Sequence, residues 1–91
     1  MTSILVEAEN LVNGDRQKAY GTPEENFGRW SHLCWASGRE NLKNLTPADL
    51  AFIMVLGKLA REANSHKRDN QVDGAAYLEL FERLQPPPGI N

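Results

Sequence analysis

Two cations and two carboxylates near the C-terminal end of the sequence have the spacing of a single polar site. Lys58 and Arg61 are spaced i, i+3, and Asp69 and Asp73 are spaced i, i+4, so each pair shares a helix face. The segment between the two predicted helices, residues 64–67, is short, which predicts an antiparallel hairpin. In that register Arg61 lies opposite Asp69, and Lys58 lies opposite Asp73.

These four side chains allow two interpretations. Lys58 and Arg61 could bind phosphate, while Asp69 and Asp73 could hold Mg²⁺, which prefers oxygen ligands and keeps several waters. Both aspartates share the helix face of Tyr77, which predicts that they point inward. The alternative is a structural ion-pair network that fixes the hairpin register, because inward carboxylates need partners.

A second cluster with ligand-binding potential lies earlier in the chain. Arg16 could contact phosphate and Tyr20 could stack on a base, close to the start of a helix. Thr22 and Glu25 have the spacing of a capping box. The alternative is therefore an ordered turn that caps the helix, and the glutamates there repel anions.

Apolar periodicity and capping residues predict the helices that must carry these side chains. We expect helices over about residues 3–12, 22–36, 46–63 and 68–84. Residues 15–21 are expected to form a loop or a short helical turn. The apolar run Leu50–Leu56 predicts that the third of these helices is central and buried. The predicted fold class is all-α, a compact bundle of about four helices whose last two form an antiparallel hairpin.

Composition limits the remaining possibilities. The chain has 91 residues, which predicts one helical domain over residues 1–85 followed by a proline-rich tail, residues 86–91. Cys34 is the single cysteine, so an intrachain disulfide framework is excluded and little remains for a zinc site. The net charge of −2 argues against a nucleic-acid partner. The apolar run Leu50–Leu56 is far shorter than the roughly 20 residues of a membrane span.

Charged side chains inside so small a core need partners that neutralise them. Paired side chains, a ligand or a second subunit could do so, which favours a homo-oligomer. Trp35 falls off the apolar face of its helix and is predicted to be a contact residue at an interface.

Several segments resemble a small bacteriophage and prophage family of unknown function. They are Gly14–Gln17, Tyr20–Phe27, Thr46–Ala51, Met54–Arg61 and His66–Asp69, followed by Asp73 and Tyr77. The resemblance implies a phage protein that acts in the cytoplasm of a bacterial host cell.

That family is distantly similar to MazG-type all-α nucleotide pyrophosphohydrolases. Those enzymes use an ExxE and an ExxD motif to hold Mg²⁺ around a nucleotide triphosphate. Lys58 and Arg61 stand in place of the first two glutamates, and Asp69 or Asn70 with Asp73 stands in place of the second motif. Cations at these positions reverse the charge that a metal cage needs.

Three functions are consistent with the sequence. The first is an oligomeric phage protein that binds a nucleotide or another phosphorylated small ligand and sequesters it without clear catalytic machinery. Mg²⁺ could be a cofactor of this binding. The second is a MazG-like Mg²⁺-dependent pyrophosphohydrolase. The third is a protein-binding module that interferes with a host factor through Trp35 and acidic surface. The candidate ligand-binding residues are Arg16, Tyr20, Lys58, Arg61, Asp69 and Asp73, of which Asp69 and Asp73 are the candidate metal ligands.

Overall fold

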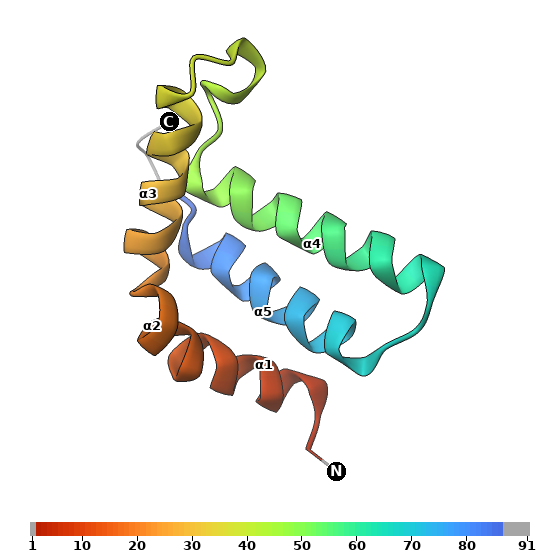
Figure 1. Ribbon diagram of the computed structural model, residues 1–91. Coiled ribbons are helices and arrows are strands. Elements are labelled where there is room, and N and C mark those ends of the chain that lie inside the picture. Colours follow the sequence, from red (N-terminus) through yellow and green to blue (C-terminus); the bar gives the residue numbers. More distant parts are fainter. Residues whose placement is uncertain (1, 87–91) are drawn as a thin grey trace.

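The computed structural model describes residues 2–86, apart from the side chains of residues 15 and 16, and this part is helical without a strand (Figure 1). The elements are α1 (Ile4–Asn13), α2 (Asp15–Tyr20), α3 (Pro23–Ala36), the 3₁₀ helix η1 (Glu40–Leu42), α4 (Pro47–Asn64) and α5 (Arg68–Arg83). The predicted all-α fold is confirmed. The short helix α2 occupies the segment for which a loop or a helical turn was expected.

The two capping boxes begin their helices as the sequence predicts. The Thr22 hydroxyl accepts the Glu25 N–H at 3.1 Å, and the Glu25 carboxylate accepts the Thr22 N–H at 3.1 Å. Thr46 and Asp49 repeat this exchange at 3.1 and 3.0 Å at the start of α4. The backbone N–H of Thr22 is the main cause that lowers the pKa of Glu25. Each box satisfies N–H groups that a helix start leaves unpaired.

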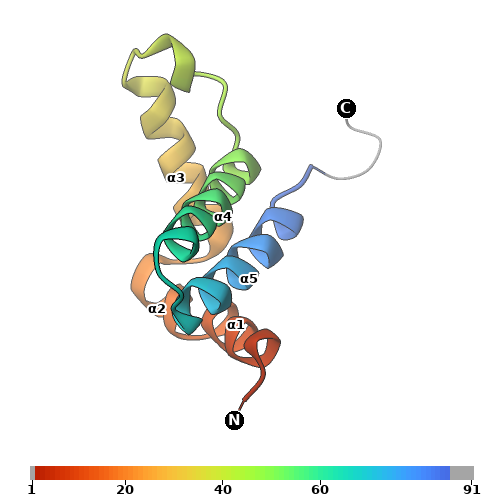
Figure 2. The ribbon, with the colours of Figure 1, turned by 90° about the vertical axis from the view of Figure 1, so that its right-hand side faces the viewer.

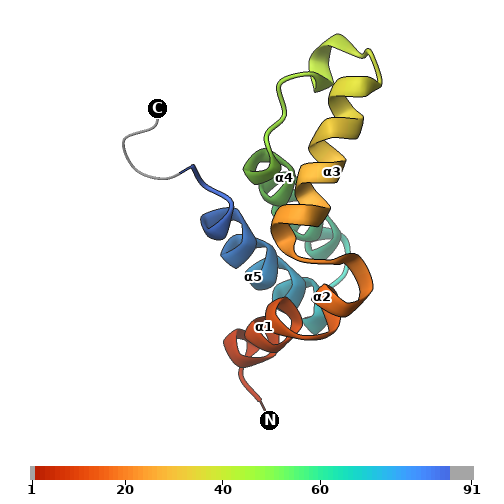
Figure 3. The same ribbon diagram turned by 90° about the vertical axis from the view of Figure 1, so that its left-hand side faces the viewer.

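Helix α5, rather than α4, is the central helix. It packs antiparallel to α4 on one side and along α1 on the other (Figure 1). Seen from the α4–α5 turn, α4, α5 and α1 follow one another as neighbouring helices (Figure 2). Helix α3 runs beside the first turns of α4 (Figure 3). The prediction that the Leu50–Leu56 segment is central and buried holds for one side only: Leu50, Ala51 and Val55 are buried. It is wrong for Phe52, Ile53 and Leu56, which are exposed.

An aromatic cluster joins α3 to α5 in the core. Phe27 has no exposed surface, and its ring lies 5.8 Å from that of Trp30 and 6.5 Å from that of Tyr77, centroid to centroid. Offset and edge-to-face rings at these distances stabilise a core beyond their buried area. The other members of the core are Ala8, Val12, Leu50, Ala51, Val55, Val72, Ala76 and Leu80. Among the described residues, no charged or polar one is fully buried.

The molecule is longer than a close-packed chain of its size. Its extents are 43 × 28 × 28 Å, and the Cα radius of gyration is 14.1 Å. A compact chain of this length has a radius of gyration of about 12 Å. No helix in the described part of the chain combines the length and the apolar character that crossing a membrane requires.

Candidate functional site

One predicted ion pair lies in the seam between α4 and α5. Lys58 Nζ lies 3.0 Å from Asp73 Oδ2, and the two side chains are 15% and 33% exposed. The backbones approach closely beside this pair, since a Cβ added at Gly74 would lie 3.8 Å from the Cβ of Lys58. The pair matches the predicted hairpin register. Because each charge has its counter-charge within the chain, the seam requires no second subunit to complete it.

The other predicted pair does not form. Arg61 and Asp69 are both exposed, and no ion pair joins them in the part of the chain that the structure describes. Arg61 lies about 60° around α4 from Lys58, and Asp69 lies about 40° around α5 from Asp73. These rotations carry the two side chains to opposite flanks of the hairpin. The prediction that Asp69 points inward is wrong for the same reason.

The two aspartates do not gather a metal cage. They line one hollow together with Glu7 of α1, but Glu7 pairs with Arg68 and Asp73 pairs with Lys58. The described residues contain no group of three or more His, Cys, Asp or Glu side chains placed to hold a metal ion. A role for Asp69 and Asp73 in holding Mg²⁺ stays a prediction.

Glu62 organises the turn between α4 and α5, and the sequence analysis missed it. Its carboxylate accepts the backbone N–H of Lys67 at 2.9 Å and shares a hydrogen bond with His66 Nδ1. It also accepts the side-chain amides of Asn70 at 3.3 Å and Gln71 at 3.0 Å. The i, i+4 spacing of Glu62 and His66 is the sequence signal that could have indicated this role.

These hydrogen bonds hold Glu62 in its charged form. The bond with His66 is the largest cause that lowers its pKa to about 2, and the Lys67 N–H is the next. Four hydrogen-bonding groups of the turn and the start of α5 already contact this carboxylate. Its negative charge is therefore stabilised within the turn.

An open hollow lies against this turn, and we call it the turn hollow. Its volume is about 530 Å³. It is lined by Ala60, Arg61, Asn64, Ser65, Lys67 and Asn70. Arg61 and Lys67 form no ion pair with any described residue. Two cations, two amides and a hydroxyl around one hollow suit an anionic group.

The second predicted cluster lies elsewhere in the fold. Tyr20 is exposed and lines a small hollow with residues of α1, α2 and α3, such as Val12 and Asn26. Helix α2 lies at the end of the molecule opposite the α4–α5 turn (Figure 1). The side chain of Arg16 lies outside the described part of the structure. The structure therefore does not bring Tyr20 to Lys58 or Arg61.

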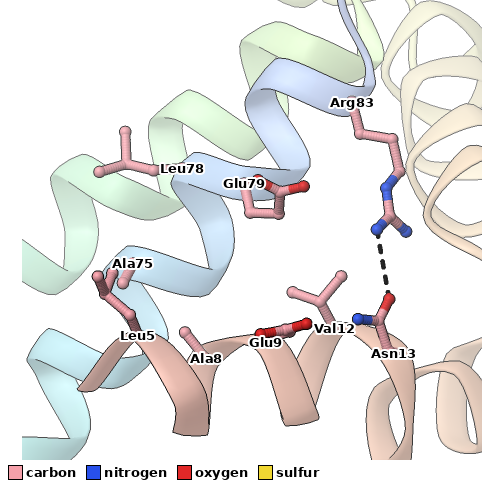
Figure 4. A pocket seen from close by; sticks show the side chains of 9 residues that line it. All are labelled: Leu5, Ala8, Glu9, Val12, Asn13, Ala75, Leu78, Glu79 and Arg83. Carbon is pink, nitrogen blue, oxygen red and sulfur yellow. Dashed lines mark hydrogen bonds between the residues drawn. The ribbon is translucent and has the colours of Figure 1, made fainter. Parts of the chain in front are cut away.

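An apolar groove between α1 and α5, the α1–α5 groove, is a feature that the sequence did not predict. Its volume is about 500 Å³. Figure 4 shows Glu79 of α5 and Glu9 of α1 on its two walls. Arg83 closes one end by donating to the Asn13 side chain at 3.4 Å. The apolar lining consists of Leu5, Ala8, Val12, Ala75 and Leu78.

Trp35 is exposed, with 60% of its surface accessible. Its ring lies 5.9 Å from that of His32, which is also exposed. Its role as a contact residue stays a prediction.

Comparison with known proteins places the chain in a family. Residues 3–85 match the family described as "Domain of unknown function (DUF6378)". The chain belongs to this family. The match thus covers all six predicted site residues and the whole α4–α5 hairpin.

The chain is similar to two mycobacteriophage proteins. It is 38% identical to the "Gene 55 protein" of Mycobacterium phage L5 over 86 residues, which cover 93% of this chain and 54% of that protein. It is also 38% identical to the "Gene 55 protein" of Mycobacterium phage D29 over 87 residues, covering 94% and 56%. The chain spans about half the length of these relatives.

These matches confirm the predicted resemblance to a phage family of unknown function. They do not show a similarity to MazG-type enzymes, which stays a hypothesis. No solved structure matches the chain.

The depressed pKa of Glu62 predicts a pH-dependent contribution to stability. An unfolded glutamate has a pKa of about 4.3, whereas folding lowers that of Glu62 to about 2. The stabilisation is therefore complete above pH about 5 and is lost as the pH falls towards 2. Melting temperatures of the wild type and Glu62→Gln should differ most at pH 5–7 and converge towards pH 2.

Glu79→Gln is the matched control, because Glu79 is an exposed glutamate on α5. Its melting temperature should follow that of the wild type at every pH. A difference between the wild type and Glu62→Gln that stays constant from pH 7 to pH 2 would contradict this assignment.

Proposed function

We propose that this domain binds a phosphorylated small ligand, with nucleotides as the leading class, in the turn hollow, and sequesters it in the cytoplasm of a host cell. One observation carries the proposal. Arg61 and Lys67 line the same hollow, and neither is neutralised by a carboxylate among the described residues. Charges that a small domain places together and leaves without a counter-charge favour an anionic ligand.

The lining supplies the donors that a phosphate group needs. The Arg61 guanidinium offers a planar fork that suits bidentate contact with phosphate oxygens. Lys67 adds a compact charge, and the Ser65 hydroxyl and the amides of Asn64 and Asn70 are neutral donors. Glu62 supports this set from behind, because its carboxylate fixes the Lys67 backbone.

This proposal changes the roles of the residues that the sequence singled out. Arg61 keeps its predicted contact with phosphate. Lys58 and Asp73 stabilise the seam through their ion pair. Asp69 lies on the α1 flank of the hairpin and Tyr20 lies near α3, so their contacts with a ligand remain predictions.

The pyrophosphohydrolase hypothesis has less support. Metal-assisted attack on a triphosphate needs carboxylates that hold the metal beside the phosphates. In the described part of the chain no such group gathers, and cations line the turn hollow. Turnover is therefore an outcome to test rather than the function we propose.

Binding should raise the melting temperature, because the ligand binds only the folded state. We expect inorganic pyrophosphate and ATP, each tested without metal, to raise it for the wild type. Arg61→Ala should weaken binding by about 10- to 100-fold, since a hydrogen bond to a charged group contributes about 1.5–3 kcal/mol. Titration followed by thermal shift and by amide NMR signals of the turn residues would measure this.

Arg39→Ala is the matched control, because Arg39 is an exposed arginine just before η1 and its removal changes the net charge equally. Equal losses in both variants would show non-specific charge attraction and would contradict the turn hollow as the site. No shift of the wild type at millimolar ligand would do the same. Release of pyrophosphate from ATP with Mg²⁺ would replace sequestration by hydrolysis.

The α1–α5 groove favours a second candidate function, the binding of a host protein. Its apolar lining between Glu9 and Glu79 suits an amphipathic helix whose apolar side chains are flanked by lysine or arginine. This surface is a better-defined partner site than Trp35, which the sequence suggested.

A helical peptide of leucines flanked by lysines is the probe for the groove. It should shift the methyl NMR signals of Leu78 and Ala75, and the same peptide with glutamates in place of lysines should not. Leu78→Glu should abolish the shifts of Ala75. If the lysine and glutamate peptides bind equally, the carboxylates of the groove do not select the partner.

A further inference from the structure

Helix α4 turns a row of large apolar side chains away from the core. Phe52, Ile53, Leu56 and Leu59 are 42%, 43%, 48% and 61% exposed. Their i, i+1, i+4, i+7 spacing places them on one side of the helix. We call these four residues the outward row. A surface helix of a monomeric domain normally has polar residues at such positions.

Two charged residues of α4, Lys58 and Glu62, lie on the opposite side from the outward row. Lys58 is the only charged residue between Phe52 and Ala60, and it pairs with Asp73 of α5. Glu62 also turns towards α5, where it accepts the Asn70 amide. The outward side of α4 therefore carries no charge from Phe52 to Ala60, while Asp49 lies one turn before it and Arg61 lies on its flank.

The apolar surface continues from α4 onto α5. The ring of Phe52 lies 5.3 Å from that of Phe81, at an interplanar angle of 47°. Phe81 is half-buried, so part of its ring extends the outward row across the hairpin. A surface that is continuous over two helices is more than a set of scattered apolar side chains.

We infer that the outward row binds a second copy of this chain, with α4 packed on α4 about a two-fold axis. A two-fold contact brings the same patch against itself, so any charge near the axis meets a like charge. The outward row is free of charge and avoids this repulsion. The net charge of −2 adds little repulsion between copies. A partner that is recognised by charge would find no complement on this surface.

The size of the surface predicts a reversible dimer. The segment from Phe52 to Ala63 rises about 17 Å along the helix axis, and specific interfaces bury about 800 Å² per partner. One helix pair of this length makes a short contact, which favours weak association. The accessible surface of the chain, 6368 Å², exceeds the roughly 5,300 Å² typical of a monomer of its mass. Surface is thus available for a dimer whose population depends on concentration.

Sedimentation equilibrium of the full chain between about 5 and 500 µM tests this inference. The wild type should shift from monomer to dimer over this range. Leu59→Glu should weaken dimerisation at least 100-fold, because it places two carboxylates in an apolar contact. Leu59 is 61% exposed, so the substitution should leave the far-UV circular dichroism and the monomer fold unchanged.

Leu33→Glu is the matched control, because Leu33 lies on α3 and is also 61% exposed. It should dimerise like the wild type. A wild type that stays monomeric at 500 µM overturns the inference. The outward row would then be a binding surface for a different protein. Equal dimerisation of both variants overturns it too, since the contact would then lie elsewhere. The inference does not depend on the turn hollow, so either proposal can fail alone.

Discussion

The seam between α4 and α5 determines what the rest of the molecule exposes. Lys58 meets Asp73 there, and one turn later Glu62 meets the polar groups of the α4–α5 turn. A partly buried charge without a partner is costly. Helix α4 is therefore held with Lys58 and Glu62 towards α5. The same rotation turns the outward row to solvent and leaves Arg61 on the flank, in the turn hollow.

Local chemistry explains why much of the fold could be predicted. Thr22 and Thr46 begin capping boxes that are satisfied within one turn, so no distant contact is needed to place them. The short turn of the hairpin fixes the pairing of Lys58 with Asp73. The burial of α4 could not be predicted in this way. Every residue from Leu50 to Leu56 is apolar, so the pattern does not indicate which side faces the core, and only the packing of α5 and α3 decides it.

The candidate site was predicted only in part, and the reason is geometric. Residue spacing alone placed Arg61 opposite Asp69, but rotation around two helices separates them. Lys67 joins Arg61 because Glu62 captures the Lys67 backbone, a contact that depends on the path of the turn. Tyr20 lies away from the turn hollow because α2 and α3 pack at the end of the molecule opposite the α4–α5 turn. Residue spacing thus identified Arg61, whereas its neighbour Lys67 in the turn hollow depends on tertiary structure.

The central claim is that the Lys58–Asp73 pair is structural and leaves the turn hollow available to a ligand. A double-mutant cycle with Lys58→Met and Asp73→Asn, followed by urea unfolding, tests it most directly. We predict a coupling free energy of about 1 kcal/mol, as for contacting residues that share an interaction. The pyrophosphate-induced rise in melting temperature should persist in all three variants. Additive effects of the two substitutions, or loss of that rise in Lys58→Met, would contradict the account.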